Sequence, residues 1–331
     1  MAITTASDWK VYDDHFRAGY AEKLTQSLRV IIERGNGAIV VEDENIPGDY
    51  LKESFWKFPT SLVTRRVATG TGSTSAVTPV TVSQGEAVHV RLSRKIGPVD
   101  ATWDAFRKIA KTPEEFSMVL GGMIAEARLQ AMLNDGLTAA RAAADKTATK
   151  YDKAALTNKT MTRAALAAGM KLMGDAREEV VAWVMHSKPY GDLVDEANTT
   201  TAGAESIVTG VALYGAAPPS MGRPIFVTDS SSLVLDETTD KYYSLGLTRG
   251  AIRIKVDGQL TAPVIQTVTG LENLVMRIQS EADWFVNIKG YTWDHASGGA
   301  NPLAAALLTS TNWDLTASDI KLASGVVIKT T

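Results

Sequence analysis

The spacing of apolar side chains predicts a helix near the start of the chain. Between residues 14 and 32, apolar side chains recur every three or four residues, at Phe16, Tyr20, Leu24, Leu28 and Ile31. This spacing places them on one face of an α-helix, and the pattern ends before a glycine at position 35. The sequence therefore predicts an amphipathic N-terminal helix.

The pattern changes to that of a long β-hairpin between residues 55 and 100. Runs of β-branched residues at 62–67, 77–82 and 88–92 surround a glycine- and serine-rich tip at 70–75. Within 88–93 apolar and polar residues alternate, which predicts one apolar and one polar face. Because a two-stranded hairpin is at best marginally stable alone, this ribbon is expected to lie on its own domain or on a neighbouring subunit.

A long helix follows the hairpin. Thr112 can cap a helix, Pro113 suits the first helical position, and Glu115 can complete a capping box. Helix-forming residues continue to about Ala144, which predicts a rod of about 45 Å at about 1.5 Å per residue. Two adjacent glycines at 121 and 122 lower the helix propensity by about 1 kcal/mol each and leave room for a bend.

The remainder of the chain alternates between helix and strand patterns. A helix is expected at 162–173, a strand at 180–185 and another helix from residue 187, followed by short strands at 208–214, 225–228, 242–247 and 252–256. Two further strands, 274–278 and 284–291, are expected to form an antiparallel pair joined by the polar stretch 279–283. The tail from residue 301 is weakly patterned. The sequence therefore predicts an α+β protein.

Composition narrows the range of functions. Hydrophobic residues make up 45% and charged residues 21% of the 331 residues, which indicates a globular chain of about two compact units. A formal net charge of −3 disfavours tight nucleic-acid binding, and the lack of cysteine excludes disulfides and thiolate chemistry. We expect no secretory signal and no membrane insertion, because no basic and apolar leader and no run of about 18 apolar residues occurs.

The sequence indicates no catalytic, cofactor-binding or metal-binding residues. Its four histidines are scattered, and no nucleophile elbow, zinc-binding helix or phosphate-binding loop is present. Asp229 follows an apolar run, where an α/β enzyme can place a catalytic carboxylate, but the sequence around it favours a turn. A cytoplasmic α+β enzyme built around Asp229 and His186 remains an alternative from another functional class.

Cations and aromatic side chains on the two projecting elements are candidate contacts between subunits. A solvated face and a charge-complementary contact explain the ribbon arginines equally well. The candidate contact residues are Arg65, Arg66, Arg91, Arg94 and Trp56 on the ribbon and Phe16 and Tyr20 on the N-terminal helix.

Several stretches of the chain resemble the major capsid proteins of tailed bacteriophages. They occur in the same order over nearly the whole chain, at residues 85–99, 103–108, 184–188, 222–230, 243–247, 301–302 and 311–313. None of them is a catalytic signature, so the resemblance depends on their order.

The resemblance implies an α+β fold of the HK97-like type. Its parts would be an N-terminal arm (1–50), an extended β-hairpin loop (51–98), a peripheral domain with a long spine helix (99–158), an axial domain (159–268), return strands of the peripheral domain (269–300) and a C-terminal tail (301–331). The tail has no assigned place.

The resemblance also implies a structural role without enzymatic activity. Members of this family form hexamers and pentamers that close an icosahedral shell around double-stranded DNA, in the virion, after procapsid assembly in the host bacterial cytoplasm. A scaffolding protein, a portal and a decoration protein are the expected partners. An encapsulin-like compartment shell with the same fold is the nearest alternative.

One branch of the family joins a lysine on the extended loop covalently to an asparagine of a neighbour. In this sequence the only lysines between Phe55 and Pro98 are Lys57 and Lys95, both at the base of the predicted hairpin. We therefore predict that this chain forms no autocatalytic crosslink.

Overall fold

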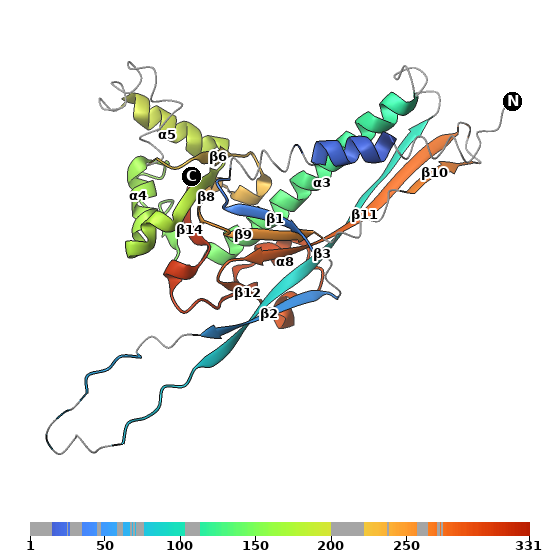
Figure 1. Cartoon of the computed structure of the whole chain (residues 1–331). Helices are drawn as coiled ribbons and strands as arrows, with labels where there is room; N and C mark the ends of the chain where they lie inside the picture. The colour runs from blue at the N-terminus through green and yellow to red at the C-terminus, as the bar shows by residue number, and fades with distance from the viewer. Residues whose placement is uncertain are drawn as a thin grey trace.

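The fold is that of a computed structural model, which describes residues 15–24, 26, 35–44, 48–57, 62–66, 68, 70, 76–102, 113–199, 222–236, 238–256, 264–269, 272 and 274–331. The predicted cap at Thr112, the predicted strand 208–214 and most of the predicted hairpin tip lie outside these residues. Two large sheets and one long helix make up most of the described part of the chain (Figure 1).

The first sheet is long and mixed. Its strand order is β1 (Ile39–Asp43), β9 (Ile252–Val256), β11 (Val275–Ile288), β3 (Ser83–Thr102) and β2 (Tyr50–Lys57), with β10 (Val264–Val268) pairing β11 at one end. Strand β3 pairs with β11 from Thr102 to Val90, and its other end pairs with β2. The single strand β3 therefore runs from the body of the molecule into the projecting ribbon.

Strand β11 corrects one expectation from the sequence. Residues 279–283 were predicted to join two strands, but they lie inside one strand of 14 residues. Ser280 and Ala282 are buried while Gln279 and Glu281 are exposed, so the alternation of a strand continues through the polar stretch. A bulge after Ile278, opposite the Gly97–Pro98 dipeptide of β3, absorbs the irregularity.

The second sheet contains the end of the chain. Its order is β4 (Lys150–Asp152), β14 (Gly325–Thr330), β8 (Lys241–Thr248), β5 (Val180–Met185) and β6 (Ile225–Val227), with β7 (Val234–Leu235) pairing β8. The C-terminal strand β14 pairs with both β4 and β8, which gives the weakly patterned tail a place in the core. The predicted strand 252–256 (β9) and residues 264–268 (β10) fall within the range 159–268 that the resemblance implied for the axial domain, and both pair with β11 in the first sheet.

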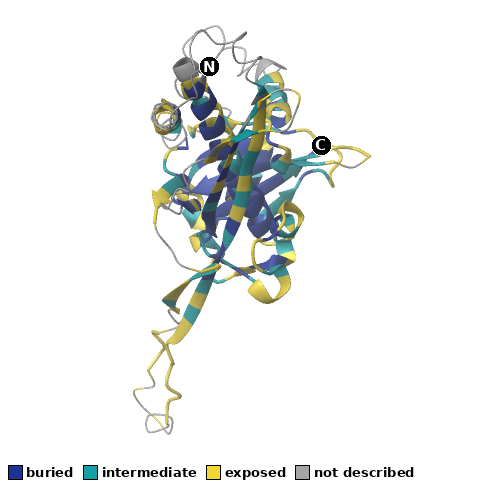
Figure 2. Ribbon diagram, turned by 90° about the vertical axis from the view of Figure 1, so that its right-hand side faces the viewer, coloured by how far each residue is buried: buried dark blue, intermediate teal, exposed yellow. Residues whose placement is uncertain are grey.

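Helix α3 (Pro113–Ala144) connects the two sheets. It has 32 residues and begins at the proline that the sequence indicated. Residues 136–144 are all buried, and their side chains share one core with Ile254 and Trp284 of the first sheet and Leu245 of the second. Figure 2 shows this buried centre between exposed extremities. The C-terminal half of α3 thus fastens the two sheets together.

The N-terminal half of α3 carries the leading helix of the chain. Residues 15–24 are helical, and Phe16 is buried against Leu120, Ile124 and Ile278. A Cβ atom on Gly121 would overlap the carbonyl oxygen of Phe16, so this glycine is needed for close helix packing. The leading helix is therefore covered by α3 of the same chain.

The smaller elements complete the fold. They are α4 (Arg163–Lys171), α5 (Ser187–Thr199), α7 (His295–Gly298), α8 (Ala304–Leu308), and the two-stranded sheet of β12 (Tyr291–Trp293) and β13 (Trp313–Leu315). The Thr162 hydroxyl accepts a hydrogen bond from the Ala165 amide and caps α4. Among the described helices, none has the length and apolar character needed to cross a bilayer.

Candidate assembly surfaces

The ribbon built on β2 and β3 projects away from the rest of the molecule (Figures 1 and 2). Beyond the paired strands, residues 62–66 and 76–82 are extended, and all their side chains are exposed. Val63 is 94% and Val77 is 85% exposed, and Leu62, Val80 and Val82 are each more than half exposed. A soluble monomer rarely exposes such a concentration of large apolar side chains, which marks the ribbon as an interaction surface.

The ribbon also carries positive charge. From Phe55 to Gly85 the sequence contains Lys57, Arg65 and Arg66 and no aspartate or glutamate. Arg65 and Arg66 are exposed, and so is Trp56 at the base of the ribbon. A basic and apolar surface of this kind is suited to a partner surface that is acidic and apolar.

The other two candidate arginines interact within their own chain. The Arg91 guanidinium lies 2.5 Å from the Asp283 carboxylate, and Arg94 donates two hydrogen bonds of 3.2 Å to Asp135. Burial raises the pKa of Asp135, although Arg94 acts against that shift. Both arginines lie where β3 pairs with β11 in the body of the sheet, and their contact with a neighbouring subunit stays a prediction.

Phe16 and Tyr20 also interact within the protomer. Their rings stack with centroids 6.5 Å apart, and the Tyr20 hydroxyl accepts a hydrogen bond of 2.5 Å from buried Arg128 of α3. These two side chains hold the leading helix on α3. Of the seven candidates, Trp56, Arg65 and Arg66 are exposed on the ribbon, and contact with a neighbour stays a prediction for all seven.

A polar network lies where the ribbon joins the body, at a place we call the ribbon root. Lys255 Nζ on β9 lies 3.0 Å from Glu53 Oε1 on β2 and 2.8 Å from Glu44 Oε2. The buried His89 ring on β3 lies 3.5 Å from the Glu53 carboxylate and 3.2 Å from Asn287 Nδ2 on β11. The network therefore joins four strands at the place where the ribbon leaves the sheet.

The charges at the ribbon root depend on this arrangement. Burial lowers the pKa of His89, although the Glu53 carboxylate acts in the opposite direction, so the ring is held neutral. Burial favours the protonated form of Glu53, but the hydrogen bond from Lys255 and the nearby His89 outweigh it and hold the Glu53 pKa below its usual value. Glu53 therefore stays negatively charged and forms an ion pair with Lys255.

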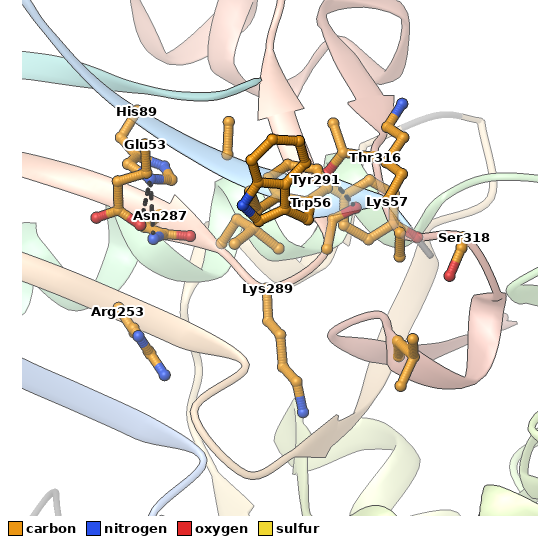
Figure 3. A pocket seen from close by; sticks show the side chains of 16 residues that line it. Glu53, Trp56, Lys57, His89, Arg253, Asn287, Lys289, Tyr291, Thr316 and Ser318 are labelled. Carbon is orange, nitrogen blue, oxygen red and sulfur yellow. Dashed lines mark hydrogen bonds and ion pairs between the residues drawn. The ribbon is translucent and has the colours of Figure 1, made fainter. Parts of the chain in front are cut away.

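A cleft of about 330 Å³ opens beside this network (Figure 3). We call it the root cleft. Trp56 and Lys57 line it from β2, Arg253 from β9, Lys289 from the turn after β11, and residues 316–318 from the loop after β13. The same view shows the Arg253 and Lys289 side chains below the labelled cluster, Arg253 on β9 and Lys289 in the turn after β11.

The arrangement around Asp229 is that of a helix cap. The Asp229 carboxylate lies 3.5 Å from the His186 ring and 3.3 Å from the Ser187 amide, while the Lys188 amide lies 3.3 Å from His186 Nδ1. Hydrogen bonds from Ser187 hold the Asp229 pKa below its usual value. The two side chains thus accept hydrogen bonds from the first turn of α5. Within the described part of the chain, no group of three or more potential ligands could hold a metal ion.

The sequence did not reveal the network or the cleft at the ribbon root. Their residues come from β2, β3, β9, β11 and the C-terminal loop, which are far apart along the chain. The available signals were His89 and Lys255, two polar residues that alternate with apolar residues in their strands. Such residues indicate a buried polar interaction but do not identify its partners.

Comparison with known proteins identifies the family. The sequence matches the family described as Gp13-like, major capsid protein 13-like, over residues 8–327. No curated protein matches the sequence. One similar solved structure is the capsid of Ralstonia phage GP4, with a TM-score of 0.47 and 12% identity over 88% of this chain and 87% of that chain. Another is the capsid asymmetric unit of cyanophage Pam1, with a TM-score of 0.49 and 11% identity over 77% of this chain and 87% of that chain. A virus-like particle from Pyrococcus furiosus is also similar, with a TM-score of 0.40 and 10% identity over 96% of this chain and 98% of that chain.

A family match over nearly the whole chain, together with an α+β fold and a projecting ribbon, defines a structural protein of a viral shell. The chain belongs to the Gp13-like family of major capsid proteins. It is a phage capsid shell protein whose place is the virion, and the predicted family, α+β capsid fold and location are confirmed.

Proposed function

We propose that this chain closes an icosahedral shell of hexamers and pentamers around double-stranded DNA by non-covalent contacts alone. In these contacts the ribbon of each copy lies on an adjoining copy. The observation that carries the proposal is the ribbon itself, which gathers exposed apolar side chains and positive charge outside the core of its own protomer.

The energy of such a contact is suited to assembly. Complete burial of a valine or leucine side chain contributes about 1.5–3 kcal/mol, so the five exposed aliphatic side chains of the ribbon together contribute on the order of 10 kcal/mol. Association costs on the order of 4–15 kcal/mol in lost freedom of motion. A single ribbon contact is therefore weak, and closure follows from many such contacts around each subunit.

We further propose that the chain performs no catalytic step, including crosslinking. The arrangement of His186 and Asp229 supports this, because their acceptor atoms serve the first turn of α5. The two candidate lysines support it as well. Lys95 lies opposite Glu281 inside the sheet, and Lys57 lies at the ribbon root.

The partners in this proposal are other copies of the chain, a scaffolding protein, a portal and a decoration protein. The enclosed DNA is held without sequence-specific binding, which the net charge of −3 supports because tight binding to phosphates requires an excess of cations. The family match favours a phage capsid over the encapsulin-like alternative.

The proposal is tested by expressing the full chain alone and beside the neighbouring phage gene products. Sedimentation velocity and negative-stain microscopy should find closed particles of many copies, and denaturing gels of those particles should contain only the monomer band. Covalent multimers would contradict the non-covalent mechanism. A protein that never exceeds a few subunits under any of these conditions would contradict shell formation.

A further inference from the structure

The root cleft combines an apolar floor with a cationic rim. Phe55, Ile288 and Leu322 supply apolar surface, and Lys57, Arg253 and Lys289 supply three positive charges. Glu53 is the single carboxylate among the residues described in its lining, and it already interacts with Lys255 at 3.0 Å. The cleft therefore has three cationic side chains and no available carboxylate to balance them.

The shape and chemistry of the cleft favour a peptide over a nucleic acid. A volume of about 330 Å³ is at the lower end of the range for sites that enclose a ligand, about 300–1,000 Å³, and holds one or two side chains. DNA backbones are bound by cations that contact exposed phosphates, which requires neither a hollow nor an apolar floor. A large apolar side chain flanked by carboxylates satisfies both features of the cleft.

The location of the cleft indicates where such a segment comes from. Trp56 and Lys57 belong both to the cleft lining and to the projecting ribbon, so a molecule lying along the ribbon also reaches the cleft. The chain itself exposes segments of the required chemistry. On α3, Met123 is 63% exposed, and the Glu126 side chain three residues later is 66% exposed and lies 3.8 Å from Lys23 Nζ of its own chain.

We propose that the root cleft is the docking site for a short acidic segment with a large apolar side chain, contributed by a second copy of this chain in the shell. The inference rests on the proposed function. The apolar side chain enters the floor beside Phe55 and Leu322, and the carboxylates pair with Lys57, Arg253 and Lys289. The ribbon and the root cleft then act as one continuous contact with the same neighbour.

Zero-length crosslinking of assembled particles tests the origin of the segment. A carbodiimide joins a lysine amine to a carboxylate that touches it, with loss of water. Particles are assembled from equal amounts of isotope-labelled and unlabelled full-length chains, and crosslinked peptides are identified by mass spectrometry. We expect Lys57 or Lys289 to be joined to an aspartate or glutamate in pairs of mixed isotope content, and these pairs should be missing from unassembled protomers.

Charge reversal tests whether the cleft contributes to assembly. Arg253→Glu and Lys289→Glu should each lower the particle yield at least about ten-fold, because like charges placed together at a contact are strongly unfavourable. Lys171→Glu on α4 is the matched control, since Lys171 is also an exposed lysine but lies far along the chain from the cleft lining. Circular dichroism melting of each variant protomer checks that the fold is kept.

The outcomes separate this inference from the proposed function. If wild-type particles form and neither Lys57 nor Lys289 is joined to a second copy, the inference is wrong and shell formation stands. If these lysines are joined only to a different protein when phage partners are present, the second-copy origin is also wrong. If no particles form at all, both the proposed function and the inference that depends on it are rejected.

Discussion

Replacing the exposed aliphatic side chains of the ribbon should abolish assembly without affecting the protomer. The variant Leu62→Ser, Val63→Ser, Val77→Ser removes side chains that are 64%, 94% and 85% exposed. Exposed substitutions usually change the free energy of unfolding by less than about 0.5 kcal/mol each. The same surface, if it is covered in the shell, contributes about 4–7 kcal/mol per ribbon, at about 1.5–3 kcal/mol per fully buried side chain scaled by these exposed fractions.

A loss of this size corresponds to a contact that is about a thousand-fold or more weaker. At equal protein concentration, sedimentation velocity should therefore find protomers or small oligomers of the triple variant where the wild-type chain forms particles. Thermal melting followed by circular dichroism should be nearly unchanged. Leu303→Ser is the control, because Leu303 is 80% exposed but lies outside the ribbon. Particles of normal size and yield from the triple variant would refute the reasoning.

Three further predictions concern the interior of the protomer. Gly121→Ala should lower the free energy of unfolding by about 1–3 kcal/mol, because the new Cβ overlaps the Phe16 carbonyl. Gly122→Ala should raise the free energy of unfolding by up to about 1 kcal/mol, because its new Cβ would meet only Lys23 at 3.8 Å. Urea denaturation of both variants tests this pair of predictions, and equal effects would contradict it. Burial holds the pKa of His89 in the folded protein below its usual 6.5. The neutral ring therefore contributes stability above about pH 6.5, and this stability is lost as the pH falls below 6.5 toward the lower pKa of the folded protein. His89→Gln should flatten this dependence in melts from about pH 7 to about pH 5, and an unchanged slope would contradict it. Arg141→Ala should cost about 3 kcal/mol by removing the donor to the Ser232 and Val234 carbonyls at 2.6 and 3.0 Å, and a denaturation midpoint like that of the wild-type protein would contradict this estimate.

The pH prediction depends on two groups that act in the same direction. The unfolded chain takes up a proton at His89 near pH 6.5 that the folded chain does not accept, so folding is disfavoured there. Glu53, whose pKa is held below 4.5 in the folded protein, contributes stability that is lost at still lower pH. A stability that increases as the pH falls from about 6.5 to about 5 would contradict the His89 assignment.

Local signals were sufficient for the long helix and for most short elements. The start of α3 at Pro113 and its end at Ala144 follow from capping residues and from a continuous run of helix formers, which act over a few residues. Strand β5 and the start of α5 at Ser187 also appear where the apolar pattern places them. The ribbon was predicted because its alternation and its glycine-rich tip are likewise local features.

Non-local pairing decided the remaining features. The polar residues of 279–283 resemble a connection in the sequence, but β3 pairs with residues 280–283 beyond the bulge and keeps them in one strand. Strand β14 has little pattern of its own, and its place follows from β4 and β8 on either side. Helix α3 covers Phe16 because Gly121 permits the two helices to approach closely. No local sequence pattern predicts this contact.

The sequence by itself determined the family, the α+β class and a basic, apolar ribbon with no acidic residue between Phe55 and Gly85. Only the tertiary structure decided which of the charged residues remain exposed on that ribbon. Arg91 and Arg94 meet carboxylates from β11 and α3, whereas Arg65 and Arg66 lie beyond the last paired strand residues. The physical reason is that composition and periodicity specify how a segment behaves alone, while the partner of a charge depends on which distant strands the fold brings beside it.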